Sequence, residues 1–127
     1  MEISDSLRNI LQIGFGVIYM IGAEFNFAYT LKNGEKFYMS FAEGTWFAPA
    51  GWFILKFVIP NPRIFTVTLI LLQLFVGIAL LSQGPYVGLG LLAGVVFCMY
   101  AVFVSNVPGA IANLAMAVIQ FYLASVQ

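Results

Sequence analysis

Long apolar runs alternate with short polar breaks along the chain, and the runs are long enough to predict helices that cross a membrane. The first run extends from Ile10 to about Tyr29. About 20 residues, each rising ~1.5 Å in a helix, cover the ~30 Å hydrocarbon layer of a bilayer. Three more runs follow, so the pattern predicts membrane-spanning helices over about residues 9–30, 64–82, 86–104 and 108–125. Ser4 or Asp5 is suited to cap the first of them.

The breaks between the last three runs are only a few residues long. Gln83-Gly84-Pro85 forms one break, and residues 105–109 form the other. Connections this short force consecutive helices to lie antiparallel and side by side. The sequence therefore predicts one all-α domain over residues 1–127, an integral membrane four-helix bundle.

The segment between the first and second runs has a different pattern. Residues 30–43 mix polar and apolar positions, and Asn33-Gly34 indicates a turn. Residues 44–60 are rich in aromatic side chains but are interrupted by Pro49 and closed by Pro60. The uninterrupted apolar stretch is too short to cross a bilayer. We predict that about residues 44–60 form an interfacial helix along the membrane surface or a short re-entrant piece; a second full span is the weaker alternative.

Four side chains are of the kinds that favour the boundary between lipid and water. Trp46, Trp52 and Lys56 lie in the first loop, and Arg8 stands at the start of the first run. Tryptophan and long cationic side chains combine an apolar body with a polar tip, and an arginine there can bind a lipid phosphate. We predict that all four are interface anchors.

Membrane orientation is left open by the charges. An even number of spans puts both chain ends on one side. The cations of the first loop outnumber the single cation near the amino terminus, Arg8; they are Lys32, Lys36, Lys56 and Arg63. The positive-inside rule then places the first loop in the cytoplasm and both ends outside.

Composition agrees with a lipid environment. The 127 residues are 62% hydrophobic and 8% charged, whereas a soluble domain is typically about half apolar and about a quarter charged. Five basic and five acidic residues cancel, so no charge excess indicates binding to nucleic acid. The first run lacks the basic n-region of a signal peptide and a small-residue cleavage site close behind it, which predicts a retained helix and not a signal peptide. We expect a multi-pass protein of a prokaryotic cell membrane, in contact with the lipid bilayer and with other membrane subunits.

The sequence offers little machinery for catalysis. It contains no histidine, so haem or chlorophyll held through histidine is excluded, and it has one cysteine, Cys98, in an apolar run. We interpret Cys98 as an inert buried thiol. Nucleophile, metal-ligand and phosphate-binding motifs are missing from the sequence. We predict no catalytic residue and no metal, leave the cofactor open between a quinone and a lipid, and expect the chain to act in an oxidoreductase only as a subunit.

Four polar residues within the predicted spans are candidates for binding a ligand. Glu24 is the most informative, because a carboxylate in hydrocarbon costs several kcal/mol and usually faces a protein interior or a water-filled cavity. Three readings of it stay open: a polar ligand or proton site, a shallow carboxylate that snorkels to the interface or pairs with Lys32 or Lys56, and a contact with a partner protein. Gln73, Asn113 and Gln120 are the other candidates. The default role of Gln73 is an interhelical hydrogen bond. Asn113 and Gln120, which share a face of the last run, are predicted to complete an interior polar strip, and with Gln73 this strip could line a narrow polar cavity.

Small residues indicate where helices approach closely. Gly84 and Gly88, and likewise Gly90 and Gly94, form small-x-x-x-small pairs. Small residues allow close van der Waals packing between helices in lipid. We predict that these four glycines lie at helix contacts, within the bundle or against a partner subunit.

Two stretches and the overall layout resemble the DoxX-like family of small membrane proteins. Residues 8–27, RNILQIGFGVIYMIGAEFNF, are similar to the opening helix of that family, and residues 71–94, LLQLFVGIALLSQGPYVGLGLLAG, to its second and third helices. The long aromatic first loop followed by three closely spaced helices is similar too. The chain departs from the family at Gln73, where an acidic residue is common, and at Glu24 and Asn26, near the usual place of a lysine.

The resemblance implies a function among several that the family contains. Members serve as subunits of quinone-linked oxidoreductases, in redox-defence or maturation complexes, and relatives serve as assembly factors. It also implies termini inside, against the lysine count. We therefore expect an accessory subunit of a membrane redox or quinone-linked complex, with Glu24, Gln73 and Asn113 near a lipid-soluble cofactor. A purely structural or assembly subunit is the alternative, and a small carrier with a polar pathway is a third.

Overall fold

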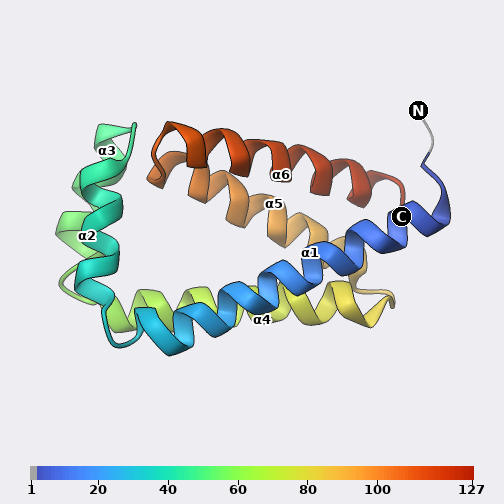
Figure 1. The fold of residues 1–127 in the computed structure, drawn as a ribbon, viewed down its shortest axis with the longest axis horizontal. Helices are drawn as coiled ribbons and strands as arrows, with labels where there is room; N and C mark the ends of the chain where they lie inside the picture. Colours follow the sequence, from blue (N-terminus) through green and yellow to red (C-terminus); the bar gives the residue numbers. More distant parts are fainter. Residues whose placement is uncertain (1–2) are drawn as a thin grey trace.

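The computed structural model describes residues 3–127, and over this range the chain is helical and has no strand (Figure 1). The predicted all-α class is therefore confirmed. The helices, in chain order, are α1 (Asp5–Phe25), α2 (Gly34–Gly44), α3 (Ala48–Phe53), α4 (Pro62–Ser82), α5 (Val87–Val104) and α6 (Val107–Ser125). Two of them continue as π-helical segments, α1 through Asn26–Thr30 and α3 through Ile54–Val58.

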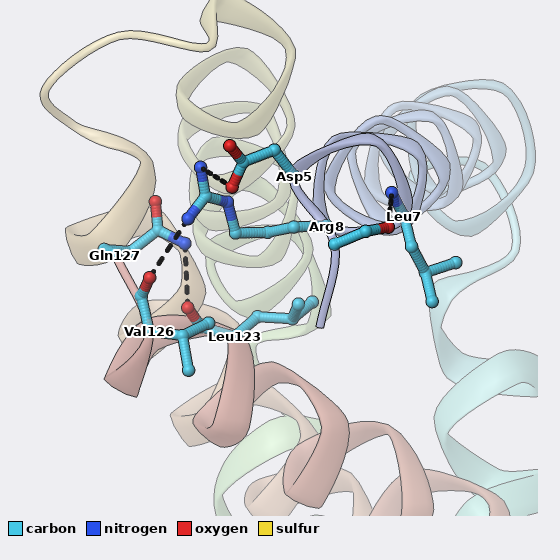
Figure 2. Close-up of polar contacts among 7 residues, drawn as sticks. Asp5, Leu7, Arg8, Leu123, Val126 and Gln127 are labelled. Atoms are coloured by element: carbon cyan, nitrogen blue, oxygen red, sulfur yellow. Dashed lines mark hydrogen bonds and ion pairs between the residues drawn. The ribbon is translucent and has the colours of Figure 1, made fainter. Parts of the chain in front are cut away.

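Four of these helices are long and apolar enough to cross a membrane: α1 with its π-helical extension, α4, α5 and α6. The first begins at Asp5, four residues before the predicted start near residue 9. Ser4 caps it, because its hydroxyl accepts a hydrogen bond of 3.2 Å from the backbone N–H of Leu7 (Figure 2). The cap satisfies one of the amides that a helix start leaves without a partner.

The four long helices associate as two antiparallel pairs. α1 packs along α4 and α5 packs along α6, and the pairs meet where α4 lies against α5. The main core gathers seven buried side chains from all four helices: Phe15, Tyr19, Val76, Leu80, Val87, Leu91 and Leu123. In Figure 1 the two pairs lie close together at the end that carries the chain termini and diverge toward the opposite end, where α2 and α3 lie.

Residues 34–58, which contain α2 and α3, run across the ends of the long helices (Figure 1). We call them the transverse segment. Residues 34–44, which the sequence left in a mixed loop, form the regular helix α2. Its register comes from tertiary contacts, because Tyr38 is buried beside Ile54 and Val58 in a second, smaller core. A mixed pattern of eleven residues carries too little periodicity to reveal this.

The predicted interfacial segment is helical over Ala48–Val58 and is shorter than the candidate spans. Eleven residues reach about 16 Å as a helix, half of the hydrocarbon layer. A second full span in this part of the chain, the weaker alternative, is therefore not what the structure contains. Pro49 lies in the first turn of α3, where its missing N–H costs nothing.

The loop before α3 holds the transverse segment against the end of α5. The indole N–H of Trp46 donates to the carbonyl of Val102 over 2.6 Å, and the Thr45 hydroxyl donates to the carbonyl of Phe103 over 2.8 Å. The Trp46 backbone N–H donates to the Ser105 carbonyl over 3.1 Å. These carbonyls lie at the end of α5, where no partner is available within the helix. The loop therefore fixes α3 against the end of α5.

The start of α1 and the end of α6 meet at the other end of the bundle. Arg8 donates a hydrogen bond of 3.2 Å to the carbonyl of Val126 and forms an ion pair of 3.4 Å with Asp5 (Figure 2). The side chain of Gln127 donates to the Leu123 carbonyl over 2.7 Å. Arg8 thus ties the start of α1 to the end of α6, in addition to the lipid-anchoring role predicted for it.

Candidate functional site

Buried polar side chains of the long helices form two separate hydrogen-bonded groups. The Tyr19 cluster consists of Tyr19 on α1, Gly94 and Cys98 on α5, and Gln120 on α6. The Asn26 cluster consists of Asn26 and Thr30 at the end of α1 and Gln73 on α4. The sequence singled out Gln73 and Gln120 but did not indicate that Tyr19 and Asn26 are their partners.

The Tyr19 cluster joins three helices through one phenol. The hydroxyl of Tyr19 lies 2.9 Å from the side-chain oxygen of Gln120 and 3.1 Å from the carbonyl of Gly94, and these two acceptors share its single proton. It also lies 3.4 Å from the Cys98 sulfur. The side-chain amide of Gln120 in turn donates to Cys98 over 3.3 Å and to the Met116 carbonyl over 3.2 Å.

These contacts leave the Tyr19 cluster closed. Cys98 is 2% exposed and Gln120 is fully buried, and the polar atoms of both side chains are engaged with neighbours. A buried polar group that is fully hydrogen-bonded fixes helix positions and costs little free energy. The arrangement suits a structural role, because it presents no free nucleophile or open acceptor to a ligand.

The Asn26 cluster connects α1 with the middle of α4. Asn26 donates its side-chain N–H to the side-chain oxygen of Gln73 over 2.7 Å, and Thr30 donates its hydroxyl to the Asn26 oxygen over 2.8 Å. Gly22 makes room for this contact: a Cβ there would lie 2.6 Å from the Gln73 side-chain nitrogen. Asn26 and Thr30 bound the π-helical turn, whose wider turn changes the rotational positions of side chains along the helix.

Glu24 lies outside both clusters. Its side chain is exposed on the surface of α1, and within residues 3–127 it forms no ion pair. The predicted pairing with Lys32 or Lys56 is therefore wrong for this structure. Lys56 instead lies over the ring of Trp52, 4.8 Å from its centre. A cation is stabilised by the face of an indole ring, which gives Lys56 a partner in its own segment.

Along its own helix, Glu24 has the position that the sequence predicted, because the π-helical extension of α1 ends at Thr30, six residues or about 9 Å beyond it. Glu24 stands between Gly22 and Asn26, which both contact Gln73. Gln73 is the twelfth of the 21 residues of α4, about 14 Å from one helix end and about 16 Å from the other at ~1.5 Å per residue. The packing places Glu24 at the level of the middle of α4.

The predicted polar strip through Asn113, Gln120 and Gln73 is not continuous. Asn113 is partly buried, and its side-chain amide donates to the carbonyl of Gly109 within α6, over 2.9 Å. Gln120 belongs to the Tyr19 cluster and Gln73 to the Asn26 cluster. Residues that share a helix face still need the same neighbouring helix to meet, and here the three amides have different neighbours.

Two of the four predicted packing glycines, Gly90 and Gly94, lie at close helix contacts. A Cβ at Gly90 would lie 2.8 Å from the Ala79 Cβ, and one at Gly94 would overlap the side chain of Gln120. Gly88 has only the side chain of Gln127 nearby, at 3.7 Å from a built Cβ. Gly84 lies in the exposed turn between α4 and α5, so it connects the two helices and does not pack between them.

Gln12 is a buried polar residue that the sequence analysis passed over. It is 2% exposed on α1, and its side-chain nitrogen has no hydrogen-bond partner within residues 3–127. Tyr38 and Thr66 form a further buried pair, with 2.8 Å between their hydroxyl oxygens. Thr66 donates its own proton to the Pro62 carbonyl over 2.8 Å, so Tyr38 is the donor of the pair. The only signal in the sequence that could have indicated the burial of Gln12, Tyr38 and Thr66 is the helical spacing of polar residues.

Two surface depressions lie at the end of the bundle where α2 and α3 are. One is lined by residues 32–36 and Met39 and has a volume of about 430 Å³. The other, about 220 Å³, is apolar and aromatic. Its lining residues are Phe47, Pro49, Ala50, Phe53, Tyr100, Phe103 and Val104. Neither depression involves the predicted ligand residues Glu24, Gln73, Asn113 and Gln120.

Comparisons of the chain with protein-family models, with curated proteins and with solved structures found no match.

Proposed function

We propose that the chain is a non-catalytic accessory subunit that packs inside a larger membrane protein complex. The observation that carries the proposal is the pairing of the interior polar side chains. Gln73 and Gln120, two of the candidate ligand residues, are engaged with Asn26 and with Tyr19. Polar side chains that bond to one another hold helices together, and those of the Tyr19 and Asn26 clusters offer a substrate no free partner.

The distribution of exposed surface supports the same proposal. In the most apolar 18-residue stretch of each long helix, 17% of α6 is buried within the chain, and 33% of α1, α4 and α5. Most of the helical surface thus faces outward, where lipid or another membrane protein covers it. Glu24, which is exposed and level with the middle of α4, favours a protein on at least one face, because a carboxylate in contact with hydrocarbon is costly.

A redox setting follows from the DoxX-like resemblance, and one structural feature favours it. The aromatic depression between α3 and the end of α5 is apolar, and Tyr100, with one hydroxyl, lies in its wall. Small-molecule sites are mostly apolar with a few polar groups that orient the ligand. A quinone ring carried by the neighbouring subunit fits this description, and the depression is the place where this chain would contact it.

The experiment is purification of the tagged chain from its native membrane in a mild detergent, followed by native mass spectrometry. We expect a complex with a fixed ratio of this chain to one or more other membrane proteins. Removing the chain genetically should shift the remaining proteins to a smaller assembly. Recovery of the chain only as a single copy, with no companion and no shift on its removal, would contradict the proposal.

A further inference from the structure

The exposed face of α1 carries a regular seam of residues with spacings of four and three. We call this the outer seam of α1; it consists of Ile10, Gly14, Val17, Ile21, Glu24 and Ala28, which are all exposed. A repeat of 3.5 residues is the pattern by which one helix packs against another with a small left-handed crossing angle. Most helix pairs in membranes cross in this way.

The opposite face of α1 shows what such a seam does when it has a partner. Gln12, Gly16, Tyr19, Ala23, Asn26 and Thr30 are all buried and follow the same alternation of four and three. Each lies two residues after a member of the outer seam, about 200° around the helix. The buried seam packs on α4, and its member Tyr19 bonds to Gly94 on α5 and to Gln120 on α6. The outer seam has the same periodicity, and within residues 3–127 no helix covers it.

Two members of the outer seam indicate that a protein helix covers it. Gly14 has nothing within 4 Å of a built Cβ, so it leaves a notch where a second helix can approach. Glu24 adds a carboxylate at the level of the middle of α4, without an ion-pair partner in the described chain. Lipid chains offer that carboxylate neither a counter-charge nor a hydrogen-bond donor.

We propose that the outer seam of α1 binds a transmembrane helix of a partner subunit that carries a lysine or arginine opposite Glu24. This inference rests on the proposed function and names the surface and the chemistry of the partner. A second copy of this chain is a poorer occupant. Two copies share one membrane orientation, and a two-fold axis along the membrane normal would bring their Glu24 side chains to the same depth. Like charges at short distance in a low-dielectric medium repel strongly.

The test introduces a photo-crosslinking amino acid at position 21 of the full chain in its native membrane. Position 71 is the matched control, because Leu71 is 63% exposed and Ile21 is 60% exposed. We expect Ile21 to crosslink to a transmembrane segment with a lysine or arginine near the crosslinked residue, and Leu71 not to crosslink to that segment. Glu24→Gln and Glu24→Lys should lower the yield about tenfold or more, since each leaves the partner's charge unpaired.

Charge exchange separates a specific pair from mere proximity. Glu24→Lys combined with substitution of the partner's cation by glutamate should restore the crosslink yield. Unfolding of purified Glu24→Gln in detergent should match that of the parent chain, because Glu24 has no ion-pair partner within it. Crosslinks from position 21 to a second copy, or to a helix without a lysine or arginine near the crosslinked residue, would overturn the inference. So would an intact complex in which position 21 reacts only with lipid, an outcome that leaves the proposed function standing. A chain without companions would overturn both.

Discussion

Asn26 donates a side-chain hydrogen bond of 2.7 Å to the side-chain oxygen of Gln73, and this contact fixes how α1 and α4 lie against each other. It sets the rotation of α1 about its axis. With Asn26 turned toward α4, Glu24 stands two residues away, about 200° around the helix, and is turned outward. The interior pair and the exposed carboxylate are thus two results of one packing arrangement.

The Asn26–Gln73 bond should contribute measurably to stability. We expect Asn26→Ala and Gln73→Ala each to lower the free energy of unfolding, and a double-mutant cycle to give a coupling of roughly 0.6–1.7 kcal/mol, as for hydrogen bonds between membrane helices. Unfolding in mixed micelles measures it. Asn113→Ala is the control, because Asn113 bonds to the backbone of its own helix. A coupling near zero would show that the contact does not hold the helices.

Substitution of Gly94 should disrupt the Tyr19 cluster. An alanine there forces the side chain of Gln120 away, and its Cβ would lie 2.8 Å from the Tyr19 hydroxyl. We expect Gly94→Ala to lower the free energy of unfolding by about 1–3 kcal/mol, as overpacking in cores does. Gly88→Ala, on the same helix, should be neutral or slightly stabilising, because a Cβ there meets only Gln127 at 3.7 Å and alanine favours helices. Equal effects of the two substitutions would be inconsistent with the packing described.

Cys98 should be protected from alkylation as long as the Tyr19 cluster is intact. It is 2% exposed and contacts both Tyr19 and Gln120. We expect a maleimide to label it only after unfolding, and Tyr19→Phe to speed labelling, because loss of the hydroxyl leaves Gln120 without that partner. Ser40→Cys on exposed α2 provides the freely labelled control. Rapid labelling of native Cys98 would argue against a closed cluster.

Tyr38 should make the contact between α2 and α4 sensitive to high pH. Burial raises the pKa of Tyr38 above its ordinary value of 10.0, because a charged phenolate is disfavoured away from water. Its stabilising contribution is then fully present below about pH 10 and is lost as the pH rises through the higher pKa of the folded state. Spectroscopic titration of the phenolates should show a late-ionising component that is smaller by one tyrosine in Tyr38→Phe. A loss of stability that begins well below pH 10 and that disappears in Tyr38→Phe would contradict a raised pKa of Tyr38.

Fluorescence can locate the transverse segment in a bilayer. Trp46 and Trp52 are the only tryptophans and both lie in this segment. In vesicles that contain brominated lipids, we expect single-tryptophan variants, Trp46→Phe and Trp52→Phe, to report similar shallow depths. Aromatic residues of this kind gather at the membrane interface. A deep position for either indole would favour a re-entrant placement over an interfacial one.

Much of the fold follows from the pattern of hydrophobic and polar residues, and the predictions from that pattern fail only locally. The long apolar runs predicted the four long helices because each run is several turns long. The pattern did not reveal α2, since only Gly34 and Tyr38 are buried in it. The candidate site was predictable only in part: Gln73 and Gln120 are buried and hydrogen-bonded between helices, but their partners Asn26 and Tyr19 are distant in sequence.

The sequence by itself determined that this chain favours lipid, because its excess of apolar residues is arranged in helix-length runs with few charges. Only the tertiary structure decided which polar side chains meet and which one is left facing outward. The reason is physical: hydropathy depends on each residue alone, whereas the rotation of each helix depends on packing against neighbours far away in the chain. That rotation pairs Gln73 with Asn26 and leaves Glu24 exposed.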